Sequence, residues 1–458
     1  MLFHSTRGKD SDKDFASILM QGLAEDGGLF LPDYWPQVDI DEIKSKTSFV
    51  EIAKCIVPLF TSSSFSYDET ISIVESTWHD FEHQDLIGIK EFDSVAILEL
   101  FHGPTAAFKD FGLQLAAAFF NQVLESENKT AIVLGATSGD TGSAAIDACK
   151  GYNRIKSFIM LPNGKMSEVQ RRQMSTIKSS NVFALRINGT FDDCQDLVKL
   201  AFKKRDFLNN DQYLLAVNSI NWTRIIGQIC YYFYAYNQLH QKGNLNFSIP
   251  TGNFGNVFAC YSAHKMGLPI KKISVAVNNN DILHRFFSDN NYSKQLVHET
   301  ISPSMDISVA SNFERLVYDF FLSRNSSKCA KMFDNFPMKP IELDVETWQR
   351  KDSLFSSSKV DDLETTKTIQ EIYQANGYIL DPHTAVAAVE AIKKSDSSNH
   401  FVVLSTAHPA KFPKVYEELN LEINSLPAAL SGLFKKEEYL HSFDADYNQV
   451  TDFIKLNN

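Results

Sequence analysis

The sequence predicts an α/β fold, in which parallel strands are covered by helices on both faces. From about residue 93 onward, short apolar runs typical of strands alternate with amphipathic runs typical of helices. This alternation is the pattern of doubly wound parallel sheets. Several segments rich in glycine and hydroxyl residues follow directly after such apolar runs. Ligands in these folds bind beyond the carboxyl ends of strands, so we expect the functional residues in those segments.

The predicted strands are apolar, and helical patterns lie between most of them. They span residues 95–101, 130–135, 155–161, 181–187, 214–217, 246–250, 273–277 and 401–405. One helix is expected over 190–204, with Thr190 as N-cap and Asp192 and Asp193 in its first turn. Residues 1–90 show several short helical patterns. The serine-rich pieces at 323–328 and 353–359 are expected to be loops or an insertion.

Composition and charge exclude several classes of function. The chain has 458 residues, which suggests two or three domains. Hydrophobic residues make up 44% and charged residues 22%, as in ordinary soluble globular proteins. A formal net charge of -12 opposes nonspecific nucleic-acid binding and a polybasic membrane anchor. An anionic substrate therefore needs a local positive pocket.

The cysteines and the N-terminus favour a cytoplasmic protein. The six cysteines show no C-x-x-C spacing and no nearby histidine pair, so we expect no metal site. Scattered cysteines in a large chain are typical of reduced core residues. No apolar segment like that of a signal peptide follows Met1. The longest apolar stretches, such as 113–120, are too short to span a bilayer.

The first candidate site is HGPTAAFKDFG, which follows the strand at 95–101. A Gly-Pro turn leads into a helix with Lys109 in its first turn. Most lysines are simply solvated. Here Phe108 and Phe111 surround Lys109 with apolar groups, and a helix N-terminus also disfavours positive charge. Both effects lower the pKa of the amine, which is what a Schiff-base lysine needs.

Three more segments lie between a strand and a helix. GATSGDTGS follows the strand at 130–135 and could present N–H groups and hydroxyls to an anion, or form only a tight turn. It is not a Walker A loop, because Gly142 precedes Ser143 where a lysine is required. PTGNFGN, after the strand at 246–250, suggests a second anion site. STAHPAKF ends the strand at 401–405, where His408 could be purely structural.

These segments together resemble the threonine synthases of bacteria and fungi. The resemblance rests on FHGPTAAFKDFG, ATSGDTGSAA, NSINWTRIIGQ, PTGNFGN and STAHPAKF, in the family's order and spacing. An N-terminal segment containing STRG and GLAEDGGLFLP extends it over nearly the whole chain. It implies the tryptophan-synthase-β-like architecture, fold type II of the pyridoxal-phosphate enzymes, with doubly wound parallel sheets and an additional N-terminal segment.

The resemblance also implies a domain organisation. An N-terminal threonine-synthase domain would span 1–90, and the catalytic region would span 91–458. Within the catalytic region, a smaller α/β subdomain would cover about 115–211, and the remainder would form the larger one.

The resemblance implies a role for each matching residue. Lys109 resembles the lysine that carries pyridoxal 5′-phosphate as a Schiff base. The loop that cradles the cofactor phosphate corresponds to Gly252, Asn253, Phe254, Gly255 and Asn256. Thr406 matches a hydroxyl that faces the pyridine nitrogen. The loop that grips the substrate carboxylate corresponds to Thr137, Ser138, Gly139 and Thr141. Asp140 departs from the asparagine of many relatives in the wider fold, near the cofactor's 3′-oxygen.

The implied activity is that of a lyase in threonine biosynthesis, which converts O-phospho-L-homoserine and water to L-threonine and phosphate by β,γ-replacement. The substrate phosphate needs its own cationic pocket. Lys165 and Arg224 follow strand ends and are candidates, although either could equally form an ordinary ion pair. We expect no nucleic-acid or membrane partner and a monomer or homodimer.

Two alternatives remain. A pyridoxal-phosphate-dependent serine/threonine dehydratase or cystathionine β-synthase would share Lys109 and the glycine loop, but those families lack the STAHPAKF and NSINW segments. A catalytically silent relative could bind only the cofactor or phosphorylated ligands, and the intact Lys109 argues against it.

Overall fold

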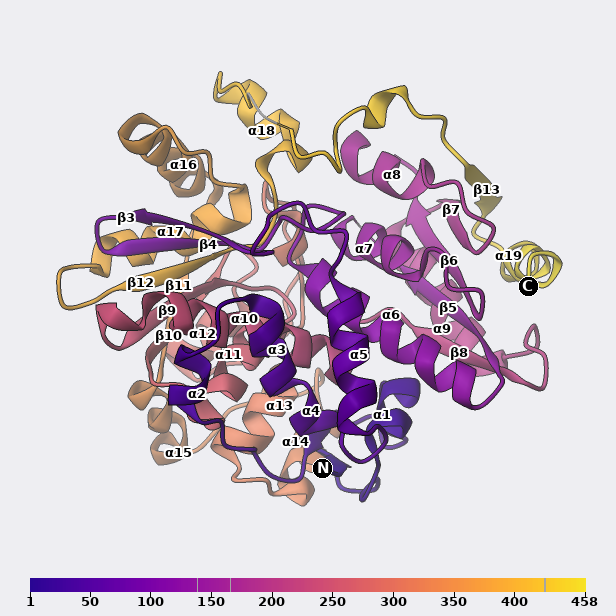
Figure 1. The fold of residues 1–458 in the computed structure, drawn as a ribbon, viewed down its shortest axis with the longest axis horizontal. Coiled ribbons are helices and arrows are strands. Elements are labelled where there is room, and N and C mark those ends of the chain that lie inside the picture. Colours follow the sequence, from indigo (N-terminus) through magenta and orange to yellow (C-terminus); the bar gives the residue numbers. More distant parts are fainter. Residues whose placement is uncertain (138, 165, 424–425) are drawn as a thin grey trace.

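The computed structural model describes residues 1–137, 139–164, 166–423 and 426–458. Within these residues the strands form two large sheets and one small antiparallel pair. The two large sheets lie side by side, with helices between and around them (Figure 1). This arrangement confirms the predicted α/β fold with two parallel sheets and an N-terminal segment.

Among the described residues the larger sheet has six strands, and β3 pairs antiparallel with β4 at one edge while the other neighbouring strands pair in parallel. Its strands, in spatial order, are β11 (Phe355–Lys359), β10 (Ile270–Val277), β9 (Leu245–Pro250), β12 (Phe401–Ser405), β4 (Val95–Glu99) and β3 (Gly88–Phe92). The smaller sheet has five parallel strands. In order they are β13 (Leu440–Asp444), β7 (Val182–Asn188), β6 (Ile155–Pro162), β5 (Thr130–Ala136) and β8 (Gln212–Ala216).

Helices cover both faces of each sheet. In sequence order they are α6 (Lys109–Ser126), α7 (Asp140–Cys149), α8 (Glu168–Ser175), α9 (Phe191–Lys204), α10 (Trp222–Leu239), α11 (Gly255–Lys265), α12 (Ile282–Asp289), α13 (Phe313–Leu316), α14 (Ser326–Asp334), α15 (Val345–Gln349), α16 (Asp362–Asn376), α17 (Pro382–Lys394), α18 (Pro413–Glu418) and α19 (Tyr447–Leu456). Short helical turns include η2 (Pro303–Met305), η4 (Arg350–Ser353) and η5 (Pro409–Lys411).

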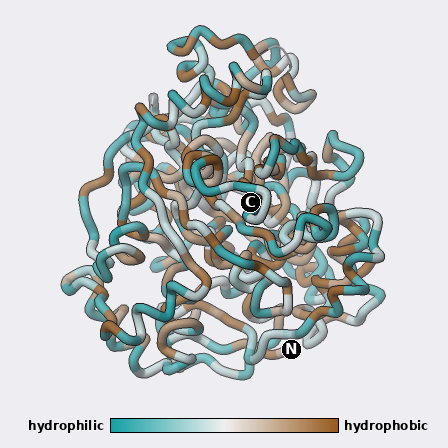
Figure 2. Tube along the Cα trace, turned by 90° about the vertical axis from the view of Figure 1, so that its left-hand side faces the viewer, coloured by the Kyte–Doolittle hydropathy of each residue, from teal (hydrophilic) through white to brown (hydrophobic). Residues whose placement is uncertain are grey.

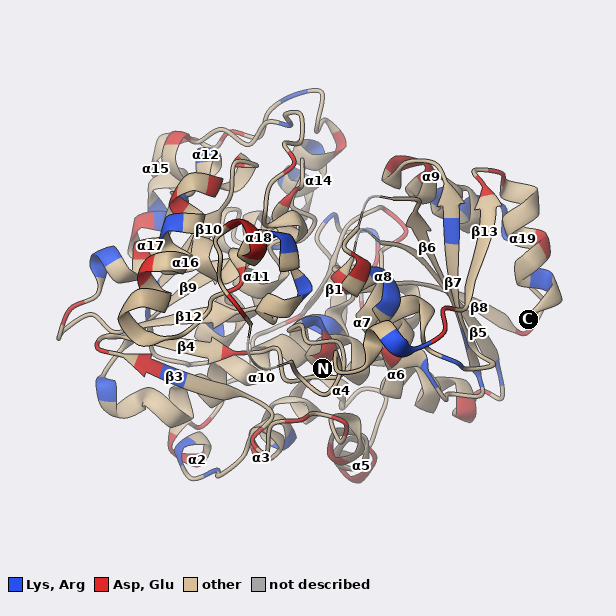
Figure 3. Cartoon of the chain, turned by 90° about the horizontal axis from the view of Figure 1, so that it is seen from above, with Lys and Arg blue, Asp and Glu red and all other residues tan. Residues whose placement is uncertain are grey.

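The strands are apolar because each sheet is buried on both sides. In β5, Ile132 belongs to the core formed with α9 and α19, whereas Val133 belongs to the core shared with α7. Neighbouring residues of a strand point to opposite faces, so a doubly covered strand needs apolar residues throughout. Figure 2 shows the hydrophobic segments of the chain running through the interior. Figure 3 shows the lysines, arginines and acidic residues mainly on helices and loops.

The N-terminal segment folds into short helices, as predicted, together with a small antiparallel pair of strands. Its elements are β1 (Phe3–Ser5), α1 (Phe15–Gln21), β2 (Phe30–Pro32), α2 (Ile40–Lys44), α3 (Phe49–Ile56), α4 (Pro58–Thr61) and α5 (Tyr67–Thr77). Helix α5 begins with a capping box between Ser66 and Glu69. The segment packs against α6 and α10, where the buried Trp222 meets Phe3 and Phe60 edge to face.

Two predictions about loops need correction. The serine-rich stretch at 353–359 was expected to be a loop, but Phe355–Lys359 forms strand β11, parallel to β10. Only Phe355 is buried in this edge strand, and its other side chains are half-buried or exposed, so serine is tolerated there. In the stretch at 323–328, helix α14 begins at Ser326, capped by Asn325. The helix expected over 190–204 is confirmed as α9, with a capping box between Thr190 and Asp193.

Candidate active site

Lys109 is the first residue of α6 and is buried, in a turn that its own neighbour holds in place. The carboxylate of Asp110 accepts hydrogen bonds from Thr105 N at 2.9 Å and Thr105 Oγ1 at 2.6 Å. Gly103 passes so close that a Cβ there would lie 2.4 Å from Asp110 Oδ2. Gly103 of the Gly-Pro turn is therefore required by packing. The turn places Lys109 at the first position of α6.

The amine of Lys109 faces a carboxylate and a hydroxyl. Its Nζ lies 3.5 Å from Asp140 Oδ2 and 3.3 Å from Ser304 Oγ. Burial lowers the pKa of Lys109, the negative charge of Asp140 opposes that effect, and the positive charges of Lys411 and Arg224 lower the pKa further. The net result is a lowered pKa, as the sequence predicted.

Asp140 opens helix α7 and binds four groups with its two oxygens. Oδ1 lies 2.8 Å from Lys411 Nζ and accepts a hydrogen bond from Gln170 Nε2 at 2.9 Å. Oδ2 accepts from Ser304 Oγ at 3.2 Å and faces Lys109. Burial alone would raise the pKa of Asp140, but the charges of Lys411 and Lys109 outweigh it and hold the pKa well below its usual value. Asp140 is therefore an ionised, buried carboxylate.

The junction between β5 and α7 is closed by a side chain of its own loop. Thr137 Oγ1 accepts hydrogen bonds from Gly139 N at 3.0 Å and Gly142 N at 2.9 Å, and donates one to Gly139 O at 3.1 Å. Thr141, in the first turn of α7, is half-buried. Ser138 and Lys165, both named from the sequence, lie outside the described residues.

The junction between β9 and α11 is open. Phe254, at φ 64°, is the N-cap of α11 and makes no side-chain capping bond. No described residue accepts a hydrogen bond from the backbone N–H groups of residues 252–257. Converging free amides at a helix N-terminus form a binding site for an anion.

Close packing around this open loop holds it in shape. A Cβ on Gly252 would lie 2.9 Å from Ser304 O, so only glycine fits there. Asn312 donates from both its backbone N and Nδ2 to Asn253 O, each at 3.0 Å. Tyr232 OH donates to Asn256 O at 2.8 Å. These contacts keep the amides in place without occupying them.

Thr406 lies directly after strand β12, beside the turn that carries Lys109. Its carbonyl accepts a hydrogen bond from Phe108 N at 2.9 Å, and Ala407 forms a β-bridge with Ala107. The hydroxyl of Thr406 makes no hydrogen bond with any residue that the structure describes. Thr406 and Lys109 are therefore held near each other, with the hydroxyl available to a ligand.

Arg224 is buried in α10 close to α6, because two glycines let the helices approach. A Cβ on Gly112 would lie 2.8 Å from Arg224 O, and one on Gly227 would lie 2.9 Å from Phe111 O. Arg224 Nη1 donates to Asn218 O, and within the described ranges no carboxylate pairs with the guanidinium. Burial lowers the pKa of Arg224 to about 10. It remains a cation whose charge reaches Lys109.

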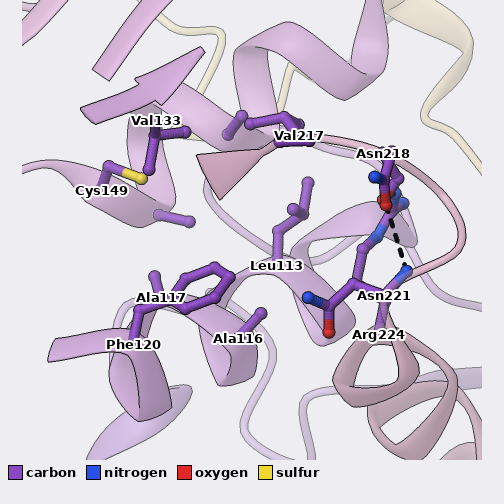
Figure 4. Close-up of a pocket in the computed structure, with 13 residues that line it drawn as sticks. Leu113, Ala116, Ala117, Phe120, Val133, Cys149, Val217, Asn218, Asn221 and Arg224 are labelled. Carbon is purple, nitrogen blue, oxygen red and sulfur yellow. Dashed lines mark hydrogen bonds between the residues drawn. The ribbon is translucent and has the colours of Figure 1, made fainter. Parts of the chain in front are cut away.

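A small cavity lies beside Arg224 and is distinct from the amide loop. Figure 4 shows Leu113 and Phe120 of α6 projecting into it, with Arg224, Asn218 and Asn221 together at one side. Its volume of about 20 Å³ leaves room for no more than a water molecule. It is not a cofactor pocket.

Sequence reasoning missed several residues of this site. Ser304 joins the two junctions, because its carbonyl lies against Gly252 while its hydroxyl bonds Asp140. Ser304 N donates at 3.1 Å to Nε2 of His383, whose Nδ1 lies 2.9 Å from Asp381 Oδ1. No local pattern in the irregular stretch around Ser304 signals this role. Lys411 lies in STAHPAKF, so the resemblance could have found it.

The arrangement combines an amine of lowered pKa, an ionised carboxylate, an open anion site and a buried guanidinium. It suits a phosphorylated cofactor held covalently and an anionic substrate. In the described part of the chain, no group of three or more histidine, cysteine or acidic side chains could hold a metal ion. No described helix is long and apolar enough to cross a membrane.

Comparison with known families divides the chain into three matches. Residues 2–78 match the family described as threonine synthase N terminus. Residues 90–329 match the pyridoxal-phosphate-dependent enzymes, and residues 384–454 match the family described as threonine synthase, C-terminal.

Individual relatives agree over the full length. The threonine synthase of Pseudomonas aeruginosa is 43% identical over 461 residues, covering 99% of this chain and 98% of that protein. The threonine synthase of Schizosaccharomyces pombe is 39% identical over 94% of this chain and 93% of its own. The structure of pyridoxal-phosphate-bound threonine synthase from Brucella melitensis matches with a TM-score of 0.95 and 38% identity, over 100% of this chain and 99% of that one.

These matches cover the N-terminal segment, both sheets and the loops that hold the buried lysine and the open amides. The chain therefore belongs to the threonine synthase family of pyridoxal-phosphate-dependent enzymes.

Proposed function

We propose that the protein converts O-phospho-L-homoserine and water to L-threonine and phosphate, the last step of threonine biosynthesis. The observation that carries this proposal is the buried Lys109 beside Asp140, in a chain that matches threonine synthases from end to end. The similarity to a threonine deaminase of Solanum lycopersicum, at 15% identity and a TM-score of 0.51, reflects a shared fold alone.

The residues present fit pyridoxal phosphate. The open amides of residues 252–257 are suited to its phosphate, and the glycines leave room for close approach. In our proposal this loop, Gly252, Asn253, Phe254, Gly255 and Asn256, binds the phosphate. Lys109 would form the covalent link, the free hydroxyl of Thr406 would face the pyridine nitrogen, and Asp140 would lie near the 3′-oxygen.

The protein's part in the reaction is to move protons and hold the substrate. When bound, pyridoxal phosphate supplies an electron sink for the carbon atoms beside the substrate's amino group. Lys109, with its lowered pKa, takes the proton from Cα and serves proton transfers at Cβ. The C–O bond at Cγ breaks and phosphate leaves with its electrons. Water then bonds to Cβ and gives up a proton, and protons are added at Cγ and at Cα to complete threonine.

Two sets of residues would hold the substrate. The loop containing Thr137, Ser138, Gly139 and Thr141 is proposed to bind the carboxylate at the N-terminus of α7, where a helix favours negative charge. Arg224, a buried cation without a carboxylate partner in the described ranges, is proposed to attract the phosphate together with Lys165. The helix end and the cation would thus orient opposite ends of the substrate.

A coupled phosphate-release assay tests this function. The purified holoenzyme should release one phosphate per threonine formed from O-phospho-L-homoserine. With L-serine or L-threonine alone it should form no 2-oxo acid at a comparable rate. A fast 2-oxo acid product without phosphate release would favour the dehydratase alternative, and binding without turnover would favour a silent relative.

The domain limits and the cellular setting also remain proposals. We propose an N-terminal domain over 1–90 and a catalytic region over 91–458, with a smaller subdomain at about 115–211. All six cysteines are free thiols, in keeping with our proposal of a cytoplasmic enzyme. We propose a monomer or homodimer, and sedimentation equilibrium of the holoenzyme would distinguish the two.

A further inference from the structure

A second lysine lies in the same buried site as Lys109. Lys411, the last residue of η5, has no exposed surface. Its Nζ lies 2.8 Å from Asp140 Oδ1 and donates a hydrogen bond to Thr105 O at 2.7 Å. A fully buried ammonium group is costly unless it is paired and hydrogen-bonded, and here it is both.

The two lysines contact the carboxylate of Asp140 at different distances. Lys411 has the short contact with Oδ1, while Lys109 lies 3.5 Å from Oδ2, a distance at the limit of a hydrogen bond. Gln170 and Ser304 take the remaining positions around Asp140. The carboxylate of Asp140 therefore forms its closer ion pair with Lys411 and not with Lys109.

The charges around Lys109 come from several elements. Asp140 of α7 is the nearby carboxylate, and Lys411 of η5 and Arg224 of α10 add two positive charges. Asp110, the next residue, binds Thr105 instead, and burial raises the pKa of its carboxyl to about 7. His383 of α17 accepts a hydrogen bond from Ser304 N at 3.1 Å and is close enough to Asp140 to act on its charge. The single ionised carboxylate of Asp140 already faces the positive charges of Lys411 and Arg224. A further positive charge on Lys109 is therefore unfavourable.

We propose that Lys411 is a positioning residue for the reaction: by holding the carboxylate of Asp140, it favours the uncharged form of the Lys109 amine. An uncharged amine is the form that can bond to the carbonyl carbon of the cofactor and accept a proton from the substrate. The inference rests on the proposed function for its purpose. The effect of Lys411 on the protonation of Lys109, however, depends only on the protein's own side chains.

The pH dependence of chemical labelling at Lys109 tests this inference. The full-length protein, freed of cofactor, is reductively methylated with formaldehyde and cyanoborohydride at a series of pH values, and the Lys109 peptide is quantified by mass spectrometry. Lys411→Gln keeps polar atoms near Asp140 but removes the charge, so the pKa of Lys109 should rise by about 1 unit or more. Lys411→Arg keeps the charge and should leave that pKa near the wild-type value.

Lys351→Met is the matched control, because Lys351 is also a buried lysine but pairs with Asp352 in η4. It should not change the labelling of Lys109. If Lys411→Gln does not fold, Lys411→Met replaces it as the test, and the pKa of Lys109 should again rise, since the charge is removed while the length of the side chain is kept. An unchanged pKa of Lys109 in the folded variant would overturn the inference and leave Lys411 as a tether for the Thr105 turn.

The labelling experiment and the phosphate-release assay can fail independently. An unchanged labelling profile with normal phosphate release would reject the role of Lys411 alone. A shifted profile without phosphate release would reject the proposed function and keep the electrostatic link.

Discussion

The two strand-to-helix junctions of the site share a plan but differ in what occupies their amides. At the junction of β5 and α7, the hydroxyl of Thr137 fills the loop and bonds Gly139 N and Gly142 N. At the junction of β9 and α11, no described residue takes the amides of residues 252–257, and the loop is held from behind by Asn312. The first junction is therefore partly closed by its own side chain, whereas the amides of the second have no partner among the described residues.

This difference is the physical basis for our proposal that the two loops bind different ligands. An open set of amides can surround a phosphate that stays bound, whereas a partly closed one leaves fewer donors for a smaller, transient group. We therefore assign the α11 junction to the cofactor and the α7 junction to the substrate. Lys109 lies between the two junctions, because its Nζ contacts both Asp140 at the α7 junction and Ser304, which packs against the α11 junction.

The largest expected effect follows from removing the amine that both junctions serve. Lys109→Ala should lower the rate of phosphate release by about 10⁴-fold, because proton transfer by a positioned group contributes on that order. Steady-state phosphate release measures it. Lys351→Ala, a buried lysine outside the site, should keep wild-type turnover. A Lys109→Ala enzyme within tenfold of wild type would remove Lys109 from the mechanism.

A negative charge at the open junction should act on the cofactor. Gly255→Asp should weaken pyridoxal phosphate binding by about 100-fold, the size of a lost charge-assisted hydrogen bond. A Cβ at Gly255 meets nothing closer than 3.5 Å, so the first atom of a side chain fits there. Gly255→Asn has the same shape without the charge and serves as control in an absorbance titration. Equal affinities in the two variants would place the phosphate elsewhere.

Removal of the buried guanidinium should act on the substrate and not on the cofactor. Arg224→Gln should raise KM for O-phospho-L-homoserine by about tenfold, the lower part of the range for a charge-assisted hydrogen bond. The cofactor absorption band should stay in place. Arg205→Gln changes an exposed arginine at the end of α9 and should leave KM unaltered. A wild-type KM in Arg224→Gln would exclude this residue from phosphate binding.

The smallest effect is expected at the closed junction. Thr137→Val keeps the shape of the side chain but removes the acceptor of two amides, so the free energy of unfolding should fall by about 1–2 kcal/mol. Urea unfolding measures this loss, and pyridoxal phosphate affinity should not change. Thr141→Val is the same replacement in the first turn of α7 and should cost less. A loss of cofactor affinity in Thr137→Val would mean that the two junctions are not separate in function.

The sequence was sufficient for those parts of the fold that depend on local patterns. Eight apolar runs predicted strands, and each coincides with a strand of the two parallel sheets. The edge strands β3, β11 and β13 were missed, because exposed strands do not need continuous apolar residues. Strand β13 is also separated from its partner β7 by more than 250 residues of chain, a pairing that no local pattern reveals.

The site was predictable only where chemistry leaves a local signature. Lys109 and the glycine loops stand out because their neighbours are unusual. Ser304 reaches the site from an irregular stretch, where a single serine carries no local signal. Lys411 lies in STAHPAKF, but a lysine there does not by itself indicate a contact with Asp140. The same holds for Arg7 of the STRG segment, whose guanidinium pairs with Glu314 of α13, Nη2 to Oε2 at 2.8 Å. Such pairs depend on the tertiary fold.

The most direct test of the central claim is to find which lysine carries the cofactor. Sodium borohydride reduction of the holoenzyme fixes the cofactor to its lysine, and peptide mass mapping identifies the residue. Lys109 and Lys411 both approach Asp140, so the result distinguishes two buried amines of one site. The structure predicts the pyridoxyl group on Lys109 alone. A label on Lys411, or on any other lysine, would contradict the account.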